Sequence, residues 1–255
     1  MRRIISLVII VLLCASAVGC AAFSEPAGIE TSASPTVSFS APDPTPTPSP
    51  SPSPTPDDGR TTIAPGFYFK PLDDEIKARI TGLSYPEDAQ DNITYDDLNV
   101  VNILHYNFEG EICFGELIVA ADLAPEVTEI FYQLYLAEYP LTSVILIDEF
   151  GGSEGDRASM TANNTSAFNY RLVAGTDKLS NHALGRAIDI NPMMNPYVKG
   201  SHVSPKNGEP YADRSVIQPG MIDKNDLCYQ LFTEHGWTWG GDWKSMKDYQ
   251  HFEKE

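Results

Sequence analysis

Basic residues are scarce in this chain, and their scarcity limits its partners. The 255 residues hold 17 Lys and Arg against 35 Asp and Glu, a formal net charge of −18. Such an acidic chain does not bind nucleic acid non-specifically, and its charge opposes binding to anionic lipids. We therefore expect no nucleic-acid partner, and any membrane attachment must come from something other than a basic surface.

Long apolar runs are also few. The run from Ile4 to Leu13 is too short to favour a permanent membrane span, and it follows Arg2 and Arg3 at the start of the chain. A basic start, an apolar run and then small residues form the layout of an export signal. Removal of Met1 to Gly19 would leave 15 basic against 35 acidic side chains, a charge of −20.

The end of this signal carries a cysteine. The sequence Ala17-Val18-Gly19-Cys20 resembles the lipobox of bacterial lipoproteins, which implies that residues 1–20 are a lipoprotein signal peptide and that Cys20 carries the lipid. The domain would then be extracytoplasmic and anchored to the cell membrane. The alternatives are an ordinary signal peptide with an incidental cysteine, or an uncleaved anchor.

Cysteine is rare in the rest of the chain. Beyond Cys14 and Cys20 in the N-terminal segment, only Cys113 and Cys228 remain. In an oxidising compartment these two thiols could form one disulfide, but two cysteines so far apart in sequence are equally consistent with separate buried thiols.

Residues 21–65 have no pattern that could bury a core. They consist mainly of Ser, Thr, Pro and Ala, and proline alternates with other residues from Pro42 to Pro56. Such repeats favour extended polyproline-like geometry and form semi-rigid spacers of ~3.1 Å per residue. We interpret the segment as a disordered linker, with a proline-motif docking site as the alternative, and place the folded domain at residues 66–255.

The domain has the patterns of a mixed fold. They predict strands at Val100–Phe108 and Glu111–Ala120 joined by a turn, helices from Pro125 to about Glu138 and from Asp223 to His235, and a short strand at Ser143–Ile147. An acidic loop is expected at Asp148–Asp156, and a long connection at Pro192–Pro219. We expect an α+β class: a small antiparallel sheet with flanking helices.

The stretch Leu179–Asn191 carries the first candidate site. His182 and Asp189 stand six intervening residues apart, with Gly185 between them. Gly185 can supply the positive φ of a tight turn, after which residues 186–191 alternate as a strand that places Ala187, Asp189 and Asn191 on one face. The two side chains look like two ligands of a metal site that still needs a third.

The C-terminal segment supplies that third ligand. His251 follows Asp248 by three residues, in a segment that also holds all three tryptophans. Two imidazoles and one carboxylate leave a zinc ion one open position for water, which is typical of a catalytic site. Asp248 is then the candidate general base, with Glu253 as a rival.

The combined pattern, Ser180-x-His182-x-x-Gly185-x-Ala187-x-Asp189 with Asp248-x-x-His251-Phe252, resembles the M15 family of zinc D-Ala-D-Ala carboxypeptidases and peptidoglycan endopeptidases. The resemblance covers residues 163–253. It implies a single M15/hedgehog-like zinc-peptidase domain, Zn²⁺ bound by His182, Asp189 and His251, and Asp248 as the base.

The resemblance also assigns supporting residues and leaves the cleaved bond open. It implies that Arg171 stabilises the oxyanion. From their residue types we expect Ser180 and Asn181 to orient the ligand turn and the second shell rather than act as nucleophiles. Trp239 is expected in the second shell or the wall of the substrate groove, with core packing as the alternative. The other two tryptophans, Trp237 and Trp243, are expected either to form a wall of the substrate groove or to pack in the core. Carboxypeptidase and dipeptidase branches tend to carry glutamate at the base position, and several L-Ala-D-Glu peptidases carry aspartate.

Two function classes remain. The first is a lipid-anchored zinc peptidase, a monomer that acts on the peptidoglycan stem peptide at the cell surface. The second is a non-catalytic wall-binding or interaction domain that retains the peptidase fold, against which the presence of Asp248 argues. A serine carboxypeptidase of the penicillin-binding type is excluded, because the sequence contains no Ser-x-x-Lys.

Overall fold

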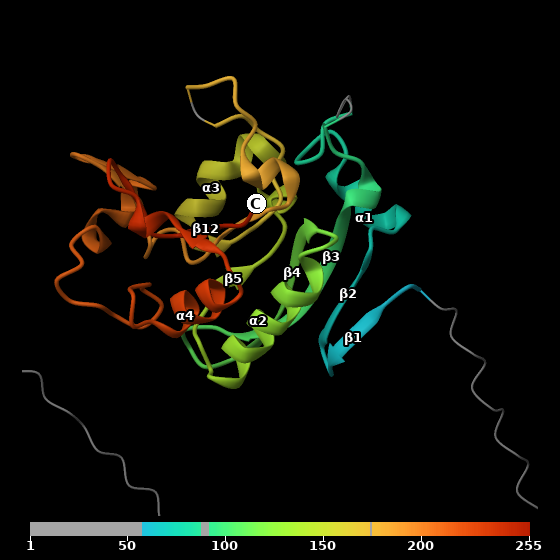
Figure 1. Cartoon of the computed structure of the whole chain (residues 1–255), viewed down its shortest axis with the longest axis horizontal. Coiled ribbons are helices and arrows are strands. Elements are labelled where there is room, and N and C mark those ends of the chain that lie inside the picture. Colours follow the sequence, from blue (N-terminus) through green and yellow to red (C-terminus); the bar gives the residue numbers. More distant parts are fainter. Residues whose placement is uncertain (1–57, 88–91, 174) are drawn as a thin grey trace, which may run out of the picture. The chain divides into compact units, whose positions relative to one another are not determined.

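A four-stranded antiparallel sheet forms the first part of the folded chain. The computed structural model describes residues 58–87, 92–173 and 175–255, which all lie in one compact unit, Pro54–Glu255. The sheet has the strand order β1-β2-β3-β4 (Figure 1). Its strands are β1 (Thr61–Ala64), β2 (Phe67–Pro71), β3 (Leu98–Tyr106) and β4 (Ile112–Ala120). The predictions for residues 1–57, which concern the signal peptide, Cys20 and most of the linker, lie outside the described residues.

The structure confirms the predicted hairpin of β3 and β4. The predicted start of the domain at residue 66 is wrong, because an earlier strand belongs to the sheet. Strands β3 and β4 pair in register from Leu98 with Ala120 to Tyr106 with Ile112. Strand β1 lies inside the range interpreted as linker, yet Thr61 pairs with Phe69 of β2. A run of polar β-branched residues joined the sheet because the apolar β2 offered it an edge, which the composition of the segment did not indicate.

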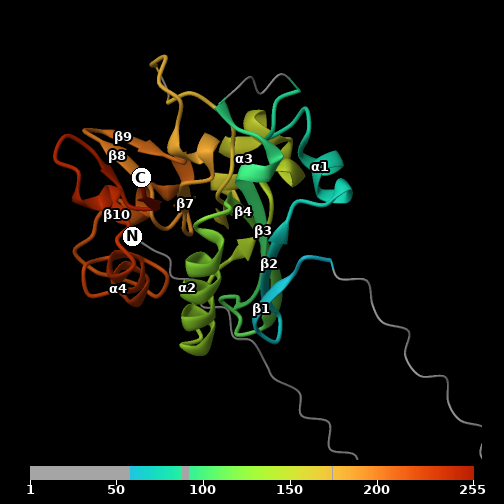
Figure 2. The ribbon, with the colours of Figure 1, turned by 45° about the vertical axis from the view of Figure 1, so that its right-hand side comes forward.

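Helices cover both faces of this sheet. Helix α2 (Ala124–Leu136) packs its Val127, Ile130 and Phe131 against one face, which confirms that its apolar stripe is core. Helix α1 (Asp74–Ile80) packs Ile76 and Ile80 into a second cluster on the other face. Figure 2 shows α2 between the sheet and α4 (Leu227–Glu234).

Small sheets and short helices build the second part of the unit. Antiparallel strands β10 (Thr238–Trp239), β12 (His251–Glu253) and β7 (Ala187–Asp189) form one sheet, in that order. A second has the order β11 (Lys247–Asp248), β8 (Tyr197–Lys199), β9 (His202–Ser204). Helix α3 (Asp156–Thr161) precedes β6 (Asn164–Thr165), which pairs in parallel with β5 (Ser143–Val144). Short 3₁₀ helices occupy Tyr95–Asp97, Ile147–Phe150, Gly152–Gly155, Asn181–Leu184, Lys206–Tyr211 and Gly240–Asp242.

The class is α+β as expected, but several details differ. The described residues form four sheets rather than one, and one of them is a parallel pair. The strand expected at Ser143–Ile147 has two residues, and much of the expected loop that follows is helical. Helix α4 begins four residues later than predicted because the Asp226 carboxylate accepts a hydrogen bond from the Cys228 backbone, which caps the helix there.

The structure answers the question of the two remaining cysteines. Cys113 and Cys228 are both free thiols, the first half-buried and the second buried. Within the described residues, no helix is long and apolar enough to cross a membrane.

Candidate metal centre

A capped turn places His182. The Ser180 hydroxyl accepts a hydrogen bond from the His182 backbone N–H at 3.3 Å and begins the 3₁₀ helix Asn181–Leu184. Gly185 ends that helix with φ +65°, the left-handed conformation expected for it. A Cβ on Gly185 would also lie 2.5 Å from the Ala120 backbone nitrogen, so glycine is required here for two reasons.

Strand pairing brings the other two side chains together. In the register of β7 and β12, Asp189 lies directly opposite His251. Residues directly opposite in an antiparallel pair project from the same face of the sheet. The turn at Gly185 then returns His182 to that face. Asp189 and His182 therefore meet His251, although they precede it by 62 and 69 positions in the sequence.

The three side chains form a triangle with the dimensions of a zinc site. His182 Nε2 lies 3.3 Å from Asp189 Oδ1 and 3.3 Å from His251 Nδ1, and His251 Nδ1 lies 3.0 Å from Asp189 Oδ1. All three residues are buried, and among the described residues they are the only such group of potential ligands. A tetrahedral zinc with bonds of about 2.05 Å separates its ligand atoms by about 3.3 Å. The donor set and its spacing therefore fit Zn²⁺.

Each imidazole is oriented by a contact on its other nitrogen. His182 Nδ1 lies 2.6 Å from the Ala167 carbonyl oxygen, and His251 Nε2 lies 3.2 Å from Glu253 Oε2. When these nitrogens donate their protons, His182 Nε2 and His251 Nδ1 present lone pairs to the centre. Partners of this kind fix the tautomer of metal-binding histidines and strengthen them as ligands. The motif spacing gave no signal for either partner.

The electrostatics of the centre favour a bound cation. Burial raises the pKa of Asp189, but His182 and His251 outweigh it and hold that pKa well below its usual range. Burial lowers the pKa of His251, yet its hydrogen bonds to Asp189 and Glu253 raise it to about 10. The acceptors around His251 therefore hold a positive charge in a buried place, which a metal ion would replace.

Asp248 lies beside this triangle. It is in β11, opposite Tyr197 of β8, and its Oδ1 is buried with no hydrogen-bond partner among the described residues. Burial and the charge of Asp189 raise its pKa to about 6, against the opposing effect of His251. A Cβ on Gly240 would lie 2.8 Å from the Asp248 Cβ and 3.3 Å from the His251 Cβ, so a glycine lets both approach.

Residues 174–254 match a family model described as D-alanyl-D-alanine carboxypeptidase, of the M15 peptidases. We call residues 174–254 the M15 segment, because they are similar to that family. The match contains all three triangle residues and Asp248, and it begins after Arg171. No curated protein and no solved structure matches the chain.

Two residues of the M15 segment support the ligand turn. Ser180 caps the 3₁₀ helix that carries His182, as described above. The Asn181 amide donates to Glu253 Oε2 at 2.7 Å, so it positions the carboxylate that contacts His251. Glu253, considered as a rival base, contacts His251 through Nε2, the nitrogen that does not face the triangle.

Arg171, just before the M15 segment, lies beside the acidic residue Asp156. Its Nε lies 3.8 Å from Oδ1 of Asp156, which is the first residue of α3. This Nε makes no hydrogen bond with any of the described residues. Its backbone carbonyl accepts a hydrogen bond from the Ser180 N–H at 3.0 Å. The arginine is therefore tied to the ligand turn through its main chain, and its oxyanion role stays a prediction.

The tryptophans of the M15 segment divide between core and site. Trp239 is buried, donates to the Tyr249 carbonyl oxygen and stacks on Phe252, so it supports β12 from the core rather than lining a groove. Trp237 is likewise buried. Trp243 is half-buried, and its ring centre lies 5.5 Å from that of His251. Trp243 is thus the tryptophan that contacts a triangle residue.

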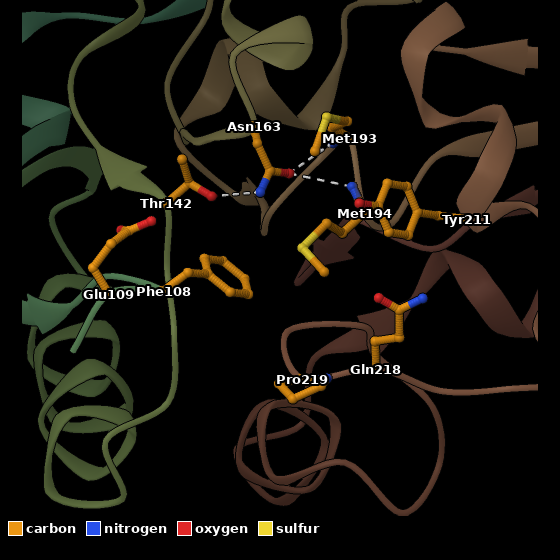
Figure 3. A pocket seen from close by; sticks show the side chains of 9 residues that line it. All are labelled: Phe108, Glu109, Thr142, Asn163, Met193, Met194, Tyr211, Gln218 and Pro219. Carbon is orange, nitrogen blue, oxygen red and sulfur yellow. Dashed lines mark hydrogen bonds between the residues drawn. The ribbon is translucent and has the colours of Figure 1, made fainter. Parts of the chain in front are cut away.

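A cavity of about 410 Å³ lies at the β3–β4 turn (Figure 3). Its lining consists of Phe108, Glu109, Thr142, Asn163, Met193, Met194, Tyr211, Gln218 and Pro219. Asn163 uses its amide on Thr142 Oγ1 and its oxygen on the backbone N–H groups of Met193 and Met194. The lining holds one carboxylate, Glu109, and no histidine or cysteine, so the cavity lacks the donor set of the triangle.

Proposed function

We propose that this protein is a zinc metallopeptidase that hydrolyses the stem peptides of peptidoglycan. One observation carries the proposal: a buried His182–Asp189–His251 triangle with zinc dimensions adjoins the Asp248 carboxyl, whose buried Oδ1 has no hydrogen-bond partner in the described part of the chain. The family match over residues 174–254 supports the peptidase class. We also propose that the unit has the M15/hedgehog-like fold. The antiparallel pairing of β7, which carries Asp189, with β12, which carries His251, supports this.

The chemistry divides between the ion and the chain. Zinc held by His182, Asp189 and His251 would polarise the scissile carbonyl and lower the pKa of a water molecule. Asp248 accepts the proton of the attacking water and then donates it to the leaving amine. Ala167 and Glu253 hold the imidazoles in the tautomers that the centre needs. Arg171 is the proposed source of positive charge for the oxyanion.

Two peptide bonds are candidates, and one observation favours each. The matching family model is described as D-alanyl-D-alanine carboxypeptidase, which favours removal of the terminal D-alanine. The aspartate at position 248, where glutamate is the usual residue in carboxypeptidase branches, favours cleavage between L-Ala and D-Glu. Mass spectrometry of the products of a stem peptide separates these outcomes directly.

A purely binding role accounts poorly for Asp248. Burying a carboxylate oxygen that has no hydrogen-bond partner among the described residues destabilises a fold, and a wall-binding domain gains nothing from it. A general base, in contrast, needs a free carboxylate oxygen that faces water or substrate. The unpartnered Oδ1 therefore favours the enzyme over the binding domain.

We propose that the protein acts outside the cytoplasm, attached to the membrane by a lipid on Cys20, and that the residues between Cys20 and β1 act as a spacer. The support is the sequence of the first 20 residues and the proline repeat from Pro42 to Pro56. Metabolic labelling with a fatty acid would be lost in Cys20→Ala if the cysteine is the attachment site. Labelling that persists in this variant would contradict the proposal.

The role of Asp248 can be tested with the Asp248→Asn variant. We expect it to bind one zinc ion per chain as the wild type does, and to lose roughly 10²- to 10⁴-fold in kcat, the contribution typical of a general base. Asp213→Asn, at an exposed position, is the control. In the wild type, kcat/KM should rise with pH as Asp248 loses its proton, with an acid limb at or below about pH 6. An Asp248→Asn protein as active as wild type would exclude this role.

A further inference from the structure

A second cavity, of about 240 Å³, lies between helix α3 and the β8–β9 hairpin. It is lined by Arg157, Thr161, Ser201, His202, Val203, Ser204, Pro205 and Lys206. Its charged lining residues are both basic, in a chain where acidic residues outnumber basic ones 35 to 17. A concave site with one sign of charge concentrates the opposite ion, so this cavity attracts anions.

Arg157 is the group best placed to hold an anion there. Its neighbour Asp156 is engaged by Asn169 Nδ2 at 3.1 Å and by Arg171. Arg157 itself is exposed and makes no hydrogen bond or ion pair with any of the described residues. Lys206 is paired with Glu209, which leaves the guanidinium as the main unpaired charge. A guanidinium binds a carboxylate through two parallel hydrogen bonds.

The cavity lies close to the proposed catalytic base. In the β11-β8-β9 sheet, Tyr197 pairs with Asp248 on one side and with Ser204, a lining residue, on the other. Two strand spacings of about 4.8 Å put Ser204 about 10 Å from Asp248. Helix α3 closes the same side, since Met160 Sδ lies 3.8 Å from Nε2 of Gln250, the neighbour of His251.

This distance corresponds to a short length of peptide. An extended chain covers about 3.3 to 3.6 Å per residue, so about three residues span 10 Å. A peptide whose scissile bond lies at the metal triangle therefore brings a group about three residues away to the cavity that Ser204 and Arg157 line. Thr161, Ser201 and Ser204 line the same cavity, and a hydroxyl group can donate a hydrogen bond to an anion.

We propose that the Arg157 cavity is a specificity subsite that binds a carboxylate of the peptide substrate, carried about three residues from the cleaved bond. The proposal rests on the peptidase function and adds to it a substrate class, peptides with a free carboxylate at that position. Arg157 acts on binding and lies apart from the groups that take part in the reaction.

The test uses a stem pentapeptide, L-Ala-γ-D-Glu-L-Lys-D-Ala-D-Ala, and two analogues in which the D-Glu α-carboxylate or the C-terminal carboxylate is amidated. Steady-state kinetics with product identification by mass spectrometry gives kcat, KM and the cleaved bond for each peptide. The proteins are wild type, Arg157→Gln and Lys199→Gln. Lys199 lies exposed in the same hairpin and does not line the cavity.

We expect amidation of the carboxylate that lies about three residues from the cleaved bond to raise KM for the wild type by roughly 10- to 100-fold. This is the effect of losing a charged hydrogen-bond pair. Arg157→Gln should raise KM equally for the free peptide, remove its preference over that analogue and leave kcat unchanged. Lys199→Gln should keep the preference.

The possible failures are distinguishable. If the wild type cleaves the peptides and Arg157→Gln keeps every ratio between free and amidated peptides, the subsite is overturned while the peptidase function stands. If zinc-loaded wild type cleaves none of the peptides, the peptidase function fails and the subsite fails with it. A thermal unfolding midpoint equal to wild type confirms that Arg157→Gln is folded.

Discussion

Each imidazole of the candidate metal centre is oriented by a contact on the ring nitrogen that faces away from the triangle. His182, Asp189 and His251 were all predicted, because the spacing of a turn, a strand and a distal motif determines which residue types can meet. The partners Ala167 and Glu253 depend on which ring nitrogen faces the centre. Sequence spacing carries no information about ring orientation, which is why the sequence alone leaves Glu253 as a rival to Asp248 for the role of base.

At the same scale, Glu253 should control metal affinity. Glu253→Ala removes the acceptor of His251 Nε2 and the partner of Asn181, so we expect zinc affinity to fall by roughly 10- to 100-fold. Glu253→Gln, which keeps an acceptor oxygen, should lose less. Competition with a chromophoric chelator measures the affinity, and Glu255→Ala at the exposed C-terminus is the control. Equal zinc affinity in all four proteins would contradict the orienting role.

Long elements were predicted well, and short ones were missed. The β3–β4 hairpin and α2 carry many apolar residues at the period of their own structure, which makes them recognisable locally. Helices α1 and α3 have only seven and six residues, and β8, β9 and β11 have two or three. Such short elements are stable only through tertiary packing, which a local pattern does not reveal.

The turn at Gly185 should be the element most sensitive to a small substitution. Gly185→Ala adds a Cβ at positive φ and also 2.5 Å from the Ala120 backbone. Gly200→Ala is a matched control, because Gly200 has φ +59° and open space around it. We expect Gly200→Ala to lower the free energy of unfolding by about 1 kcal/mol and Gly185→Ala by about 1 to 3 kcal/mol more. Denaturant unfolding measures both, and equal losses would show that the close approach is unimportant.

The metal centre depends on the packing of the whole unit. One hydrophobic cluster includes Val101 of β3, Phe131 of α2, Phe232 of α4, and Ile188 and Phe252 of the strands that carry the ligands. The sheet of the first part therefore supports the ligand strands of the second part through α2 and α4. Contacts over such sequence distances are set by tertiary structure, which explains why the number of sheets and the start of the domain were not predicted.

The central claim is that this unit cleaves stem peptides with the help of a metal ion held by the triangle. The most direct measurement is mass spectrometry of muropeptides incubated with the purified protein, with excess EDTA, and with EDTA followed by zinc. The account predicts defined cleavage of one peptide bond, its loss in EDTA and its recovery when zinc is restored. Cleavage that is unchanged in excess EDTA, or no cleavage by the zinc-loaded protein, would contradict it.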